Sequence, residues 1–128
     1  LSFIKIKDLK NITLLDSVSK ENVPSFINAM DLSLIHLKKC KTFKNVIPSK
    51  IFENAAMGKT IILGVEGESK KIIEKYKLGL PFEPGNFNSF ISALEKSKLF
   101  NIENREDFLN EFSRNNQAKK MYKLLKSI

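Results

Sequence analysis

The residues best suited to chemistry lie in the stretch 45–69, NVIPSKIFENAAMGKTIILGVEGES. A Pro-Ser pair opens a helical pattern at Ser49, and a carboxylate, Glu53, follows about one turn later. The first N–H groups of a helix have no acceptor within the helix, so they can donate hydrogen bonds to phosphate oxygens. Lys44 and Lys50 flank this position and can add point charges to the same oxygens. Glu53 lies too far along the helix to share the phosphate, but its carboxylate can accept hydrogen bonds from the vicinal hydroxyls of a ribose.

A plainer explanation of the same residues stays open. Glu53 can simply complement the helix dipole, an effect that contributes typically about 0.3–1 kcal/mol. The lysine-rich loop before it, 38–44, is in most proteins a solvated surface. The spacing therefore predicts either a nucleotide site, with amides and lysines for the phosphates and an acid for the sugar, or a stabilised helix start.

A second candidate is the turn GVEGES at 64–69, which follows the apolar run TIIL. Its two glycines permit close approach of the backbone, but Glu66 and Glu68 repel a phosphate. These acids suit sugar hydroxyls or helix capping better, and the turn matches neither of the usual glycine-rich phosphate motifs. His36 ends the preceding apolar run and is expected at the same rim, as an acid/base group, a sugar contact or a structural residue.

The composition limits the class of protein. With 128 residues, 42% of them apolar, the chain forms one domain with a core of its own. The net charge of +8 predicts an anionic partner: a phosphorylated small molecule, a nucleic acid or an acidic membrane face. Because only Arg105 and Arg114 can make bidentate forks, nucleic-acid recognition is disfavoured. A single cysteine, Cys40, and the lack of a signal peptide or spanning segment suit the cytoplasm.

Strand-like and helix-like runs alternate along the chain, which predicts a Rossmann-like, doubly wound parallel sheet of the α/β class. In such sheets ligands bind beyond the carboxyl ends of the strands. The opening residues, 1–10, have the mixed pattern of a helix tail or a frayed strand. Strands are predicted at 12–15, 32–37, 60–64 and 80–82, and helices from about 21–23, 49, 68, 86–88 and 104.

Several residues set the expected helix boundaries. Ser19 is a good N-cap for the first helix, and either Asn86 or Asn88 caps a later one. Gly58 and Gly79 are expected to end the two helices that precede them. Ile72, Ile73 and Tyr76 mark the inner face of one helix. After residue 104 the chain is expected to be helical, with apolar residues at helical spacing: Phe108, Leu109, Phe112, Met121, Leu124 and Leu125. No catalytic residue, metal-ligand cluster or cofactor motif is legible, so neither a metal nor a cofactor is expected.

Between about residues 11 and 94 the chain resembles the C-terminal, donor-binding domain of family 4 (group 1) glycosyltransferases. It is most similar to the branch that builds bacterial capsule and O-antigen sugars. The resemblance rests on Asp31 before a buried strand, Pro-Ser-Lys-x-x-Glu at 48–53, Ala-x-Gly-Lys-Thr-Ile-Ile at 56–62 and Gly-Leu-Pro-Phe-x-Pro-Gly at 79–85, in that order.

The resemblance implies a GT-B enzyme and assigns roles to the residues that match. Glu53 corresponds to the second of two glutamates with seven residues between them, the one that holds the donor ribose. The first position is Asn45 here, which can hydrogen-bond a sugar but cannot supply a carboxylate. The amides around Val46 and Ile47 are then expected to face the diphosphate. The implied reaction is a metal-independent, retaining transfer from a UDP-sugar.

The resemblance also implies missing parts. The earlier strands of the donor domain, which carry the family's basic pair, and the N-terminal acceptor domain are not found in this sequence, so the chain is expected to be inactive by itself. An anionic membrane surface and a lipid-linked acceptor are further expected partners. The basic amphipathic end of the chain, 115–128, is in the family a helix that crosses back to the N-terminal domain; membrane contact is the alternative.

Two other interpretations remain open from the sequence. The first is a basic nucleic-acid-binding module, suggested by the charge alone. The second is a stand-alone regulatory or scaffold domain of α/β fold, which becomes attractive if these residues are all that the gene encodes. Binding of UDP favours the transferase, whereas steeply salt-dependent binding of an oligonucleotide favours the first alternative.

Overall fold

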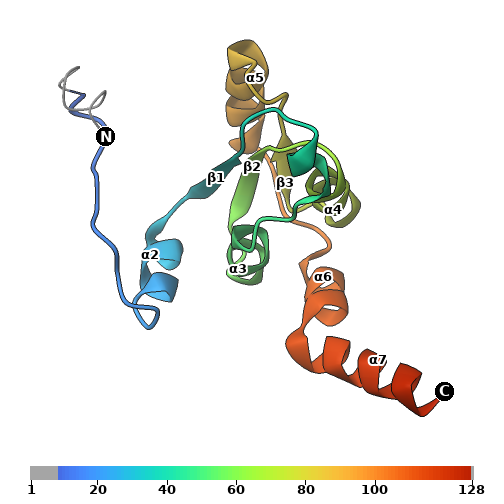
Figure 1. Cartoon of the computed structure of the whole chain (residues 1–128). Helices are drawn as coiled ribbons and strands as arrows, with labels where there is room; N and C mark the ends of the chain where they lie inside the picture. Colours follow the sequence, from blue (N-terminus) through green and yellow to red (C-terminus); the bar gives the residue numbers. More distant parts are fainter. Residues whose placement is uncertain (1–8, 128) are drawn as a thin grey trace.

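The computed structural model describes residues 9–127 and has an α/β fold, in which a three-stranded parallel sheet alternates with helices (Figure 1). The predicted Rossmann-like class is confirmed. The strands are β1 (Leu32–His36), β2 (Thr60–Gly64) and β3 (Gly79–Pro81). The helices are α2 (Val23–Ala29), the 3-10 helix η1 (Thr42–Asn45), α3 (Lys50–Ala56), α4 (Glu68–Tyr76), α5 (Phe87–Ser97), α6 (Arg105–Phe112) and α7 (Arg114–Lys126).

The register of the sheet brings the ends of the strands together. β2 lies in the centre, where it pairs with β1 from Leu32↔Thr60 to His36↔Gly64 and with β3 from Ile61↔Gly79 onward. Because the strands are parallel, their carboxyl ends meet at one edge. The two predicted ligand loops, 38–49 and 64–69, both leave the sheet from that edge.

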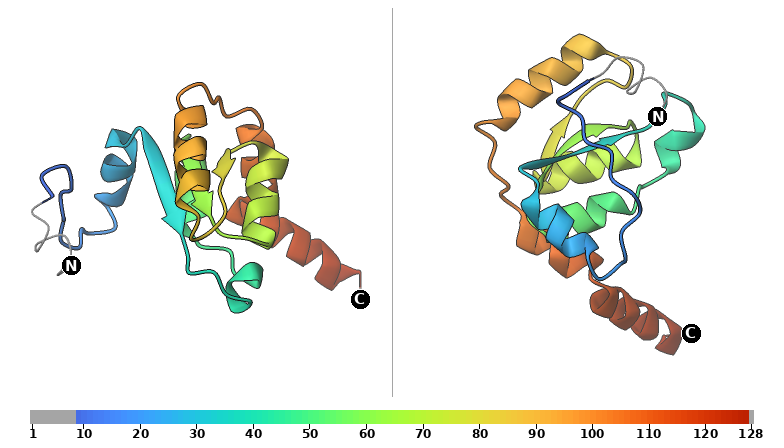
Figure 2. Two further views of the ribbon diagram at one scale, coloured as in Figure 1. Left: turned by 90° about the horizontal axis from the view of Figure 1, so that it is seen from above. Right: turned by 90° about the vertical axis from the view of Figure 1, so that its left-hand side faces the viewer.

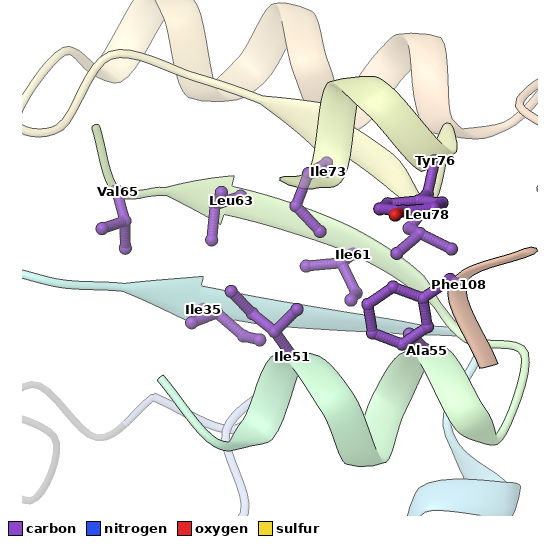
Figure 3. Packing of buried hydrophobic residues seen from close by; sticks show 10 residues of the cluster. All are labelled: Ile35, Ile51, Ala55, Ile61, Leu63, Val65, Ile73, Tyr76, Leu78 and Phe108. Atoms are coloured by element: carbon purple, nitrogen blue, oxygen red, sulfur yellow. The ribbon is translucent and has the colours of Figure 1, made fainter. Parts of the chain in front are cut away.

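Helices cover both faces of the sheet. α5 lies on one face, against β2 and β3, while α3 and α4 lie on the other (Figure 2). The main core lies between the sheet and the helices α3 and α4 (Figure 3). It joins apolar residues of the sheet to those of three helices: Ile35, Ile51, Ala55, Ile61, Leu63, Val65, Ile73, Tyr76, Leu78 and Phe108.

The face toward α5 is covered less completely. Side chains alternate along a strand, so Leu34 and His36 of β1 point away from the main core. Both are exposed, and Leu34 keeps 54% of its surface in solvent. α5 packs on β2 and β3 rather than on this edge strand.

Several predicted helix boundaries are confirmed. α2 begins at Val23, inside the expected range, with a proline in its first turn. α3 ends at Ala56, and Gly58 follows with φ +68°, the left-handed conformation that glycine adopts without strain. Asn86 caps α5, because its side chain accepts a 3.0 Å hydrogen bond from the Ser89 N–H.

Other local expectations were wrong. Residues 12–15 form no strand but an extended segment outside the sheet, at the left of Figure 1, with Leu15 66% exposed. The N-cap of α2 is Asn22 rather than Ser19. α4 ends at Tyr76 with Lys77 in the left-handed conformation, whereas Gly79 belongs to β3. A Cβ at Gly79 would overlap the Ile61 carbonyl oxygen, so this glycine serves close packing of β3 on β2.

The C-terminal part is helical as predicted, but it forms two helices separated at Ser113, whose backbone is extended. Phe108 is buried in the core, and Leu109 and Phe112 pack against it. Met121, Leu124 and Leu125 continue the same apolar spacing, but all three are exposed. Of the opening residues, 1–8 lie outside the part that the structure describes. Among residues 9–127, no helix is both long and apolar enough to cross a bilayer.

Candidate functional site

At the carboxyl edge of the sheet, two aromatic rings pack against Gly64, where there is no room for a side chain. A Cβ at Gly64, the last residue of β2, would overlap the rings of both His36 and Phe82. These two rings lie beside each other with centroids 5.5 Å apart, one from the last residue of β1 and the other from the residue after β3. The predicted rim residue His36 is therefore held at the carboxyl edge of the sheet, next to an aromatic ring that the sequence did not indicate as its neighbour.

The two candidate loops form one unit. Gly67 has φ +78°, and a Cβ at this position would overlap the Lys44 carbonyl oxygen. Two residues later the fully buried Ser69 hydroxyl donates a 2.7 Å hydrogen bond to the Val46 carbonyl. The loop after β1 is thereby fixed to the start of α4. The sequence analysis did not single out Ser69, whose role depends on a partner 23 residues away.

Ion pairs balance much of the positive charge on this rim. The Lys44 ammonium lies 3.2 Å from the Glu66 carboxylate, and Lys39 lies 2.8 Å from Glu83. The hydrogen bond from Lys39 lowers the pKa of Glu83, and the same bond raises the pKa of Lys39. Glu68 makes a 2.6 Å pair with Lys71 within α4. An incoming phosphate would have to compete with Glu66 for Lys44.

The amides before α3 are only partly available. The Val46 N–H donates to the Phe43 carbonyl at 3.3 Å, which closes η1. The Ile47 and Ser49 N–H groups have no acceptor within residues 9–127, and Pro48 between them has no N–H. Lys50 begins α3 and is exposed, as is Asn45 at the end of η1.

Glu53 lies in a hollow between α3 and the C-terminal helices, with a volume of about 550 Å³. Its carboxylate is exposed and makes no ion pair with any residue in the range 9–127. The aromatic floor comes from Phe52, whose ring centroid is 5.4 Å from that of Phe112. The lining consists of Ser49, Phe52, Glu53, Ala56, Phe108, Leu109, Phe112, Ser113 and Arg114.

Four of the predicted site residues line hollows, in three different places, whereas Asn45, Val46, Ile47, Lys50 and Glu68 line none of these three. Ser49 and Glu53 share the hollow just described. Lys44 lines a recess of about 10 Å³ with Glu66 and Pro84, which is about the size of one water molecule. His36 lines a third, apolar groove of about 280 Å³ with Leu34, Phe82, Gly85, Asn86, Phe87 and Phe90.

Two features of the Glu53 hollow were missed by sequence reasoning. Arg114 brings a guanidinium to the same hollow, and Phe112 supplies part of its wall. The helical spacing of Phe108 and Phe112 placed them in one helix, but it gave no sign that they face α3. Arg114 follows a helix break that the sequence analysis did not locate, so nothing in the local pattern connects it to Glu53.

These features define a Rossmann-like α/β chain with a carboxylate-bearing hollow between α3 and the C-terminal helices. Within residues 9–127 the structure has no group of three or more His, Cys, Asp or Glu side chains placed to hold a metal ion. Comparisons with protein-family models, curated proteins and solved structures found no match to this chain.

Proposed function

We propose that this chain is the nucleotide-sugar-binding part of a GT-B glycosyltransferase that acts in bacterial surface polysaccharide synthesis. The observation that carries the proposal is the Glu53 carboxylate, which makes no ion pair with residues 9–127 and lines a hollow of about 550 Å³. This volume is in the range of small-molecule sites, which is about 300–1,000 Å³. The resemblance of residues 11–94 to donor-binding domains supports the same assignment.

In the proposed complex, Glu53 accepts hydrogen bonds from the ribose hydroxyls of a UDP-sugar. The free N–H groups of Ile47 and Ser49 and the ammonium of Lys50 are directed to the diphosphate. Arg114, on the opposite wall of the hollow, adds a second cation beside the nucleotide. Because Lys44 is paired with Glu66 and Val46 with Phe43, we assign these two residues a smaller share of the binding.

The proposed reaction is a retaining, metal-independent transfer. The bond between the anomeric carbon and the β-phosphate oxygen breaks and UDP leaves with the electron pair. The acceptor hydroxyl oxygen bonds to the same face of that carbon, and its proton passes to the departing β-phosphate oxygen. This chain binds and orients the donor, with Asn45, His36 and Glu68 as candidate sugar contacts. A separate N-terminal domain supplies the acceptor site. We place the protein in the cytoplasm, peripheral to the inner face of the membrane.

The test is a titration of the 128-residue chain with UDP, ADP and GDP, followed by amide NMR shifts and calorimetry. We expect UDP to shift the amides of Ile47, Ser49 and Glu53. Glu53→Gln keeps the shape but removes the charge, and a hydrogen bond to a charged group contributes about 1.5–3 kcal/mol. The variant should therefore bind UDP at least about tenfold more weakly.

The matched control is Glu95→Gln, which removes an exposed carboxylate of α5 and should leave UDP binding unchanged. Equal UDP affinity in Glu53→Gln and the parent chain would show that Glu53 only complements the dipole of α3. Binding of an oligonucleotide that weakens steeply with salt, without any response to UDP, would replace the proposal with the nucleic-acid-binding alternative.

A further inference from the structure

The last helix, α7 (Arg114–Lys126), is unusually open to solvent. None of its residues is buried, although it contains several large apolar side chains. Leu124 is 67% exposed, and Met121, Tyr122 and Leu125 are each exposed by more than half. Figures 1 and 2 show the helix leading away from the sheet to the C-terminus. An apolar set of this size is expected to have a partner.

Most of the apolar and all of the lysine residues lie on opposite sides of α7. At about 100° per residue, Ala118, Met121 and Leu125 fall on one side, as does Arg114 of the first turn, and Tyr122 and Leu124 lie at its two margins. The opposite side holds only lysines among its charged residues: Lys119, Lys120, Lys123 and Lys126. The ammonium of Lys126 lies 4.9 Å from the centre of the Tyr122 ring, near the boundary between the two sides.

The charge of α7 has one sign only. Residues 114–126 carry one arginine and four lysines and no carboxylate. The nearest acidic residue is Glu111 of α6. Among the described residues, Lys120 is the one lysine of α7 that lies near this carboxylate, and its charge helps to lower the pKa of Glu111. The ammonium groups of Lys119, Lys123 and Lys126 make no ion pair within residues 9–127.

The helix is held to the body through its first turn. Ser113 caps it by accepting a hydrogen bond from the Asn116 N–H at 3.3 Å. The Asn116 side chain donates to the Asn110 carbonyl at 2.7 Å, and the Gln117 side chain donates to the Glu111 carbonyl at 2.5 Å. Beyond Gln117 no hydrogen bond connects α7 to another described element, so its apolar side is free to bind elsewhere.

We propose that α7 binds an anionic membrane surface, lying in the plane of the interface. A helix with an apolar side and an opposite side rich in lysine can bury the first in the acyl boundary while the second contacts anionic headgroups. A nucleic acid would use the lysines but leave Met121, Leu124 and Leu125 in water. This inference does not depend on the proposed function, because no residue of α7 beyond Arg114 lines the Glu53 hollow.

The experiment is sedimentation of the full chain with vesicles of phosphatidylcholine alone and with vesicles that contain 30% phosphatidylglycerol. We expect binding to the anionic vesicles only, weakening as salt is added. The double variant Met121→Ser/Leu125→Ser should lower the partition coefficient at least about tenfold. The control is Leu99→Ser, which removes an apolar side chain that is 90% exposed but lies outside α7, and should leave partition unchanged.

A second pair of variants separates charge from apolar contact. Lys123→Glu should weaken binding to the anionic vesicles several-fold, while Lys98→Glu, the same charge change after α5, should have a much smaller effect. Since α7 buries no side chain, all of these variants should keep the folded circular-dichroism spectrum of the parent.

Three outcomes would overturn the proposal. The first is no binding to anionic vesicles by the parent chain. The second is an equal loss in Leu99→Ser and Met121→Ser/Leu125→Ser, which would show that α7 is not the contact. The third is self-association of the parent that the double variant abolishes without any change in vesicle binding, which would assign the apolar side to a second copy of the chain. UDP titration of the same variants reports separately on the Glu53 site.

Discussion

Helices α6 and α7 are consecutive, but their surroundings are opposite. In α6, Phe108 is 1% exposed and packs against the rings of Phe52 and Tyr76, which come from α3 and α4. In α7, Leu124 is 67% exposed, although it belongs to an apolar set of similar spacing. The chain turns at Ser113, where ψ is 140°, and from that point α7 leaves the body.

The difference shows that an apolar face on a helix indicates a surface that needs a partner, but it does not indicate which partner. α6 lies over the end of the core, with Arg105 at its start and Phe112 at its end both reaching α3. α7 extends past that contact, so its stripe has no core within reach. Its lysines suit an external anionic partner. Three matched pairs of variants test this contrast, each with one residue in the body and one in α7.

The largest contrast is expected between Phe108→Ala and Leu124→Ala. The first leaves a cavity in the core and should lower the free energy of unfolding by about 3–5 kcal/mol. The second removes exposed atoms and should change it by less than about 0.5 kcal/mol. Urea unfolding followed by circular dichroism measures both. Similar losses for the two variants would mean that α7 packs on the body in solution.

A smaller contrast is expected between the two arginines, changed separately to methionine. The Arg105 guanidinium donates to the Ala55 carbonyl at 3.2 Å and to the Ala56 carbonyl, and thereby satisfies the end of α3. Arg105→Met leaves the Ala56 carbonyl without a donor among the described residues, while the Ala55 carbonyl keeps its bond from the Gly58 N–H; the expected cost is about 1–3 kcal/mol in the free energy of unfolding. Arg114→Met should cost less than about 0.5 kcal/mol, because Arg114 is exposed at the start of α7. The reverse order of losses would contradict the contrast.

The smallest contrast concerns the two tyrosines and acid stability. The Tyr76 hydroxyl donates to the Glu111 carboxylate, and this bond, with Lys75, lowers the pKa of Glu111. A carboxyl whose folded-state pKa is depressed contributes stability above its unfolded pKa, about 4.3, and loses it as the pH falls through the folded value. Tyr76→Phe should therefore make the difference in the free energy of unfolding between pH 7 and pH 3 smaller than in the parent chain.

The measurement is urea unfolding at pH 7 and at pH 3 for the parent and for both variants. The control is Tyr122→Phe, since Tyr122 is exposed in α7 and has no carboxylate partner among the described residues. Its pH dependence should equal that of the parent. A decrease in acid sensitivity that is the same in both variants would exclude the Tyr76–Glu111 bond as its cause.

Local patterns predicted much of the fold because the signals were local. The apolar runs at 32–37 and 60–64 were predicted as strands and became β1 and β2. Only β2 is buried on both faces, because β1 leaves Leu34 and His36 exposed on one. Gly58 and Asn86 ended and began helices as expected because capping depends on a residue and its nearest neighbours along the chain.

The predictions that were wrong concern residues whose local structure depends on contacts with distant parts of the chain. Residues 12–15 have strand-like composition, but a strand forms only where an edge is available to pair with it. Gly79 was predicted to end a helix because glycine is common at helix ends. Instead it belongs to β3, where the lack of a side chain lets the backbone pack closely on Ile61. Lys77 therefore takes the left-handed position at the end of α4.

The candidate site shows the same division. The sequence indicated Glu53, the basic loop and the glycine-bearing turn, because each has a recognisable local chemistry. It could not show that Lys44 is paired with Glu66, or that Ser69 holds the Val46 carbonyl, since these contacts join separate loops. Phe112 and Arg114 reach the hollow only through the packing of α6 on α3.

By itself the sequence determined the alternation of strands and helices, the class of fold and the excess of positive charge, because these depend on composition and on short-range spacing. The tertiary structure decided which apolar stripes are buried, which lysines are paired and which residues face Glu53. The physical reason is that burial and ion pairing are properties of two surfaces that meet. The sequence of one surface does not specify which partner it will contact.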